Sequence, residues 1–196
     1  GFGKPTGIDL PHEKPGLIPS REWKRKRMGE NWYPGENLNM AIGQGYNQVT
    51  PIQVARFVSA LVNGGDLIKP SLTQDAPVIQ DHLPLTDKQR EFIVDAMVQT
   101  VQEGTGRVLQ RKDARMGGKT GTAQVVRLKA SEAERRRKLE EMEYWERDHA
   151  WTATFGQKGD RPYVVGCMVE HGGHGGSTAG PVVKAVYDYL FGERTS

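Results

Sequence analysis

The sequence predicts an α+β fold, and two observations carry that prediction. Three segments place apolar residues at helical spacing, namely 50–63, 86–104 and 181–192. Three later segments are short and rich in β-branched and aromatic residues, namely 119–126, 150–155 and 161–169. Only a few residues separate the last two segments, so they should form an antiparallel hairpin.

Composition narrows the class of protein before any motif is considered. The chain has 196 residues and a formal net charge of +3, which excludes a polycationic nucleic-acid tail and a strongly acidic disordered chain. Cys167 is the only cysteine, so an internal disulfide framework is excluded. Because Cys167 lies within an apolar strand pattern, we expect an inert core residue.

Residues 1–49 are rich in Gly, Pro and Asn and show no sustained period, which predicts turns and extended segments. So long an irregular stretch is typical of a functional surface or of a wrap around other parts of a protein. Within it, residues 21–27 carry five basic side chains and one acidic side chain. Nucleic-acid or membrane binding is one interpretation, but no other basic patch accompanies this one. We favour a solvated charged loop, and expect no nucleic-acid partner.

The helical segments have recognisable ends. Thr50 and Gln53 form a capping-box pattern with Pro51 at the first helical position, and Thr86 with Gln89 repeats the pattern. Asn63 and the two glycines after it should end the first helix, and Gly104 the second. The last helix should begin near Pro181 and end at Gly192.

A charged insertion, residues 127–149, separates the first predicted strand from the hairpin. Its acidic and basic residues nearly cancel, and Glu132–Arg136 and Glu134–Lys138 are i,i+4 pairs in the favourable order. These pairs predict an exposed helix that bridges two strands. A partner-binding helix is the alternative interpretation.

Two motifs suggest ligands that their context excludes. His171 and His174 could ligate a metal, but four of the six residues 171–176 are glycine, and we expect a turn rather than a metal site. Residues 117–120 resemble the end of a phosphate-binding loop, yet Asp113 stands where that motif requires glycine and a strand pattern follows it. We therefore expect neither a metal nor another cofactor.

The sequence Lys119-Thr120-Gly121-Thr122 suits an anionic ligand. On a strand, Lys119 and Gly121 share one face while the two threonines share the other. The ammonium supplies a positive field, the hydroxyls can bind a carboxylate, and glycine permits close backbone approach. An edge strand would also offer free N–H groups to a peptide.

Four segments in order, 5–11, 41–53, 118–123 and 170–176, resemble those of the penicillin-binding transpeptidases. The resemblance implies a penicillin-binding transpeptidase or serine β-lactamase-like fold, a mostly antiparallel sheet flanked by helices. That family carries its nucleophile in Ser-x-x-Lys and a second serine in Ser-x-Asn. None of the six serines here stands in either motif. We therefore expect residues 1–196 to be the carboxy-terminal part of a single transpeptidase domain, with both motifs upstream of Gly1 and no activity in the isolated chain.

The resemblance also implies roles for the residues of the 119–122 motif. Lys119 would assist the proton relay, and the N–H of Thr122 would be an oxyanion donor, so these two are the candidate catalytic residues. Thr120, Gly121 and Thr122 would bind substrate, the hydroxyls holding the terminal carboxylate of a D-Ala–D-Ala stem peptide or of a β-lactam. The enzyme would cross-link peptidoglycan from the bacterial inner membrane, with its catalytic domain in the periplasm. Implied partners are the upstream part of the domain and the membrane proteins of the elongation complex.

Two alternatives share these features. A serine β-lactamase or β-lactam sensor uses the same strand motif and differs in how fast the acyl group is released. A non-catalytic fragment that binds partners through residues 127–149 is the second alternative.

Overall fold

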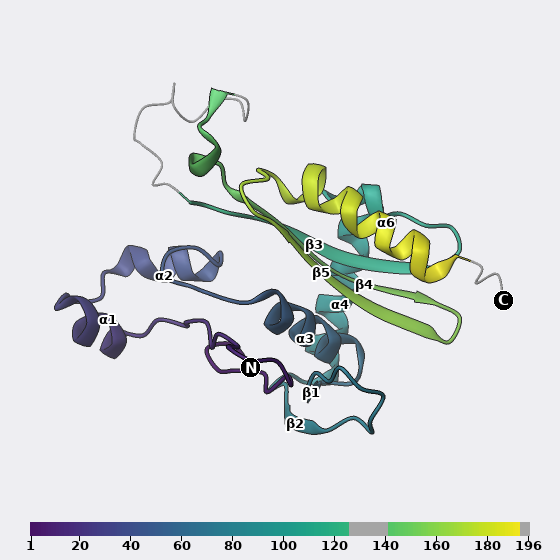
Figure 1. Cartoon of the computed structure of the whole chain (residues 1–196), viewed down its shortest axis with the longest axis horizontal. Coiled ribbons are helices and arrows are strands. Elements are labelled where there is room, and N and C mark those ends of the chain that lie inside the picture. Colours follow the sequence, from purple (N-terminus) through teal and green to yellow (C-terminus); the bar gives the residue numbers. More distant parts are fainter. Residues whose placement is uncertain (126–140, 193–196) are drawn as a thin grey trace.

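The computed structural model describes residues 1–125 and 141–192, and the predicted α+β class is confirmed. β3 (Arg115–Ala123), β4 (His149–Lys158) and β5 (Arg161–Val169) form an antiparallel sheet in the order β3-β4-β5. β1 (Asp66–Ile68) and β2 (Ile79–His82) form a separate antiparallel pair. Figure 1 shows α6 (Gly180–Phe191) on one face of the larger sheet and α3 (Pro51–Val62) with α4 (Asp87–Gln102) on the other.

The core is divided between the two faces of this sheet. Phe155 points toward α3 and α4 and packs with Leu61 and Met97. On the opposite face, Met116 packs with Tyr187 and the rest of the apolar side of α6. Burial raises the pKa of Tyr187 to about 12. These two clusters fix the sheet, and with it the position of β3.

The predicted helix starts at residues 50 and 86 are confirmed. Thr50 Oγ1 accepts from the N–H of Gln53, and the Gln53 side chain accepts from the N–H of Thr50. Thr86 and Gln89 make the same reciprocal pair at α4. Gln53 also donates to the carbonyls at residues 4 and 15, at 2.8 and 2.9 Å. The capping residue of α3 therefore also anchors the irregular amino-terminal segment.

The prediction of a charged loop at residues 21–27 is wrong. This segment is α1 (Arg21–Met28), and a second helix, α2 (Pro34–Ala41), follows it. Ser20 accepts from the N–H of Trp23 and begins α1. Lys24 is buried and pairs with Glu36 at 2.6 Å and Glu30 at 3.4 Å. The buried side chain of α1 is thus held by ion pairs, which hydrophobic periodicity cannot reveal.

Strand boundaries differ from the predicted ones because glycine lies inside strands here. β3 begins at Arg115, not at residue 119, and ends at Ala123. A Cβ on Gly117 would lie 2.4 Å from the ring of Phe155, so only glycine fits beneath that ring. β4 likewise continues through Gly156, where a Cβ would lie 2.7 Å from the ring of Tyr187. The predicted hairpin is confirmed, with its turn at residues 159–160.

The helix predicted over residues 127–149 falls largely on residues 126–140, outside the described residues. The described remainder, residues 141–149, includes the 3-10 turn η3 (Tyr144–Glu146) and contains no α-helix. Two other short elements are the 3-10 turn η1 (Arg107–Leu109) and a π-helical turn, η4 (Gly175–Ala179), that leads into α6. Cys167 lies in β5, partly buried beside the cluster under α6, and burial raises the pKa of its thiol. In the described part of the chain, no helix is both long and apolar enough to cross a membrane.

Candidate active site on strand β3

The motif at residues 119–122 lies on β3, an outer strand of the three-stranded sheet. Its partner residues on β4 run from Ala153, opposite Lys119, to Ala150, opposite Thr122. Directly opposed residues in an antiparallel pair share a face of the sheet. The register therefore fixes the face on which each side chain of the motif lies.

Lys119 shares the α3 side of the sheet with its partner Ala153, which packs against the α3–α4 core. Thr120 lies on the other face, opposite Thr152, whose hydroxyl donates to the carbonyl of Gly175 at 3.0 Å. The predicted division of the motif between two faces is confirmed. A ligand that contacts both Lys119 and Thr120 must therefore lie along the outer edge of β3.

Hydrogen bonds hold three side chains of this edge in place. Lys119 is exposed, and its Nζ donates to the carbonyl of Thr120 at 2.6 Å. Thr120 Oγ1 lies 2.6 Å from Thr105 Oγ1, in the turn after α4. Thr122 Oγ1 lies 3.4 Å from Nδ1 of His174, a long contact at an exposed position. The Thr122 hydroxyl is consequently the more easily recruited by a ligand.

Residues 171–174 form an irregular turn, as predicted, whereas Gly175 and Gly176 already belong to η4. The absence of side chains on the glycines lets this segment lie close against the sheet. A Cβ on Gly175 would lie 2.0 Å from the carbonyl oxygen of Trp151 and 2.6 Å from that of Gly121. This close approach brings His174 to Thr122 at the edge of β3. It also explains why position 175 cannot carry a larger residue.

The two histidines of the turn have different neighbours. His171 donates its backbone N–H to Nδ1 of His149 at 2.9 Å, and its own Nδ1 lies 2.9 Å from the carbonyl of Arg147. His174 instead reaches Thr122. Among the described residues, no group of three or more His, Cys, Asp or Glu side chains is placed to hold a metal ion.

Gln44 is a site residue that the sequence prediction missed. It lies in the turn after α2, and its Nε2 donates to the carbonyl of Thr122 at 2.8 Å. Its Oε1 accepts from the N–H of Gln124 at 3.3 Å. In the sequence, residues 43–45 lie within the family-like segment 41–53, and the glycines on either side of Gln44 are the signal of a tight turn. Both have positive φ, 74° and 75°, and shape a turn that presents this side chain.

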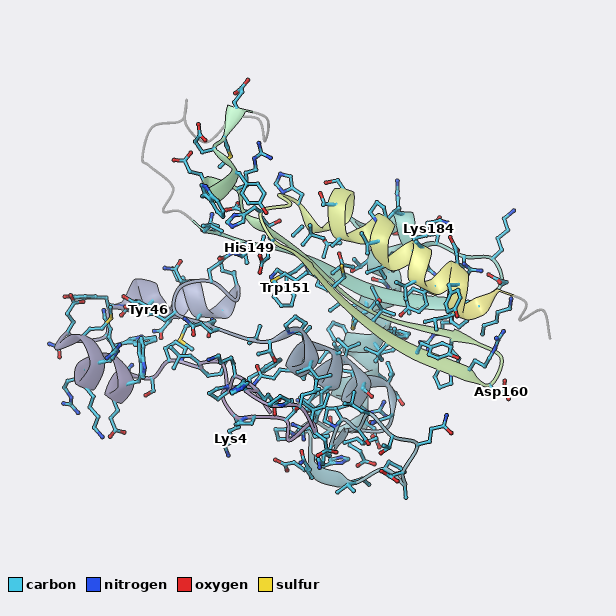
Figure 2. All side chains as sticks on the ribbon, viewed as in Figure 1. Lys4, Tyr46, His149, Trp151, Asp160 and Lys184 are labelled. Carbon is cyan, nitrogen blue, oxygen red and sulfur yellow. The ribbon has the colours of Figure 1, made fainter. Side chains whose placement is uncertain are left out.

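A pocket of about 620 Å³ adjoins the motif on the α3 side. Its wall includes Gly121 and Thr122 of β3, and Trp151 contributes an indole from β4. Figure 2 shows Trp151 at this position, between the sheet and the chain that joins α2 to α3. Gln44 and Met168 complete the surface next to the motif. The candidate site therefore consists of the polar edge of β3 and the largely apolar pocket beside it.

This arrangement provides two of the three parts needed for acyl transfer. The strand edge offers an ammonium and two hydroxyls for a carboxylate, and backbone N–H groups for a developing oxyanion. The third part is an activated serine, and none of the six serines of this chain stands in Ser-x-x-Lys or Ser-x-Asn. The site therefore resembles one wall of an active site.

Comparison with known proteins gives a consistent result. The sequence profile of the penicillin binding protein transpeptidase domain matches residues 1–188. Peptidoglycan D,D-transpeptidase MrdA of Haemophilus influenzae is 34% identical over 208 residues, covering 99% of this chain and 32% of that protein. The chain spans about a third of the length of the curated relatives it matches.

Solved structures resemble the whole chain. The structure of Pseudomonas aeruginosa PBP2 in complex with WCK 5153 aligns with a TM-score of 0.78 and 36% identity, covering 100% of this chain and 42% of that one. The complex of PBP2 with MreC from Helicobacter pylori gives 0.76 and 31%, covering 98% and 34%. The similarity extends over both faces of the sheet as well as the β3 motif.

Proposed function

Because the chain belongs to the penicillin-binding protein transpeptidase domain family, we propose that it forms the β3 wall of the active site of a peptidoglycan D,D-transpeptidase. The observation that supports this most strongly is the outer strand β3, with Lys119 toward α3, both threonines on the opposite face and the outer edge of the strand between them. The fold expected from the resemblance, a penicillin-binding transpeptidase fold, agrees with the architecture described above.

In the proposed reaction, a stem peptide that ends in D-Ala–D-Ala lies along the edge of β3. The hydroxyls of Thr120 and Thr122 bind its terminal carboxylate, and the Lys119 ammonium favours that charge. A serine hydroxyl, supplied by a segment outside these 196 residues, attacks the carbonyl carbon of the penultimate D-Ala. Its proton passes through the relay that includes Lys119 to the departing amine.

The negative charge that develops on the carbonyl oxygen is stabilised by the N–H of Thr122 and by a second donor beside the serine. Loss of D-Ala leaves an acyl-enzyme ester. An amine of a neighbouring strand attacks this ester, forms the cross-link and regenerates the serine. If water replaces the amine, the same site acts as a D,D-carboxypeptidase. A β-lactam forms the corresponding ester, and its carboxylate occupies the place of the terminal carboxylate.

The proposed setting follows the relatives. We propose that the protein works in the periplasm from the inner membrane, as expected of a peptidoglycan transpeptidase. The MreC complex of the Helicobacter protein supports an elongation-complex partner for this one. Co-purification of full-length protein with its own MreC homologue tests the partner. A variant lacking residues 127–149 then tests whether that insertion carries the interaction.

Fluorescent penicillin tests the proposed activity. Full-length protein should form a covalent adduct that persists for many minutes, as expected of a transpeptidase. Release of the product within seconds would identify a β-lactamase instead. Absence of any adduct under conditions where the protein is folded would refute the proposal.

A further inference from the structure

We infer that Gln44 is a positioning residue that holds the end of β3, so that the N–H of Thr122 is aimed at the ligand. This inference rests on the proposed function, because it concerns the donor assigned there to the oxyanion. Gln44 touches neither Lys119 nor a threonine hydroxyl in the described contacts. Its bonds are to the backbone of β3 and of the residue just beyond it.

The side-chain amide of Gln44 does what a neighbouring strand would do. It donates to the carbonyl of Thr122 and accepts from the N–H of Gln124, two residues along. A strand presents the carbonyl of one residue and the N–H of the second residue after it on the same side. β3 ends at Ala123, so Gln44 supplies one more pairing step where the regular strand stops.

The turn that carries Gln44 is itself fixed. The N–H of Gln44 donates to the carbonyl of Asn39 at 2.9 Å, at the end of α2. The side chain of Asn47 donates to the carbonyl of Gln44 at 3.0 Å and contacts that of Met40 at 3.4 Å. With its backbone held on both sides, Gln44 can hold β3 in turn.

The consequence for the site follows from strand geometry. The N–H and the carbonyl of a single residue point to the same side of an antiparallel strand. Gln44 donates to the carbonyl of Thr122 from the outer side of β3, so the N–H of Thr122 points outward as well. Lys119 donates to the next outward carbonyl, that of Thr120. Gln44 therefore fixes the direction of the Thr122 N–H and ends the edge available to an incoming peptide at this residue.

The test compares substitutions at two glutamines. Gln44→Met keeps the length of the side chain and removes both hydrogen bonds. Gln99→Met makes the same substitution at an exposed position of α4, outside the pocket beside the motif. Full-length wild type and both variants are compared by acylation rate with fluorescent penicillin, by hydrogen exchange of the 122–125 backbone and by melting temperature.

The inference predicts that Gln44→Met is acylated about tenfold more slowly, as expected for the loss of one to two net hydrogen bonds. Its 122–125 amides should exchange faster, and its melting temperature should stay near that of Gln99→Met. Equal acylation by the two variants, or faster acylation of Gln44→Met, would overturn the positioning role. If wild type itself forms no adduct, the proposed function fails, and unchanged exchange in Gln44→Met would separately overturn the role of Gln44.

Discussion

Removing the hydroxyl of Thr122 is the sharpest perturbation of the proposed carboxylate site. Thr122→Val keeps the shape of the side chain on β3 and deletes one donor. In the free protein that hydroxyl has only a long, exposed contact of 3.4 Å to His174, so its loss should change the stability of the fold little. A hydrogen bond to a charged group contributes about 1.5–3 kcal/mol. Since about 1.4 kcal/mol corresponds to a tenfold change in rate, β-lactam acylation should slow roughly 10- to 150-fold.

The assay is the second-order acylation rate of full-length protein with a fluorescent penicillin, followed by gel and intact mass. Thr100→Val is the matched control, because the Thr100 hydroxyl is bonded to the Ala96 carbonyl within α4. The control should be acylated like wild type. Both variants should show melting temperatures close to that of wild type. An acylation rate in Thr122→Val equal to that of Thr100→Val would remove this hydroxyl from the site.

Three further predictions concern stability and ligands. Arg111 holds the pKa of Asp113 well below its usual range, so the ionised Asp113 stabilises the folded state above about pH 4, and this contribution is lost progressively as the pH falls further. The melting temperature of Asp113→Asn should therefore lie below that of wild type at pH 7, and the gap should narrow as the pH falls toward 2. Gly117→Ala places a methyl group against the ring of Phe155 and should cost about 1–3 kcal/mol of unfolding free energy, whereas Gly35→Ala, with open space around it, should cost less than 1 kcal/mol. The glycine-rich turn should hold no metal, so dialysed protein should contain no stoichiometric zinc by elemental analysis; zinc that survives dialysis would contradict this.

The sequence predicted those elements whose signals are local. The capping boxes at Thr50 and Thr86 mark the helix starts because both partners lie within four residues. The division of Lys119 and Thr120 between faces follows from the period of a strand alone. The glycine-rich turn before α6 was likewise predictable, since few other structures tolerate so many glycines.

What the sequence could not predict depends on contacts between distant segments. From the sequence alone, Gly117 suggests a break in the strand. In the structure it lies inside β3, because the ring of Phe155 from β4 leaves no room for a side chain at this position. α1 has no apolar periodicity, because its buried residue is Lys24, held by carboxylates that follow it in the chain. Gln44 is separated from Thr122 by 78 positions, and only the folded structure brings the two together.

The central claim is that this chain supplies the carboxylate- and oxyanion-binding wall while the nucleophile comes from outside it. Mapping the β-lactam adduct tests this most directly, by peptide mass spectrometry on full-length protein and on the isolated 196-residue chain. The account predicts one adduct in the full-length protein, on a serine outside this chain, and none in the isolated chain. A stoichiometric adduct on any of its own six serines, Ser20, Ser59, Ser71, Ser131, Ser177 or Ser196, would contradict it.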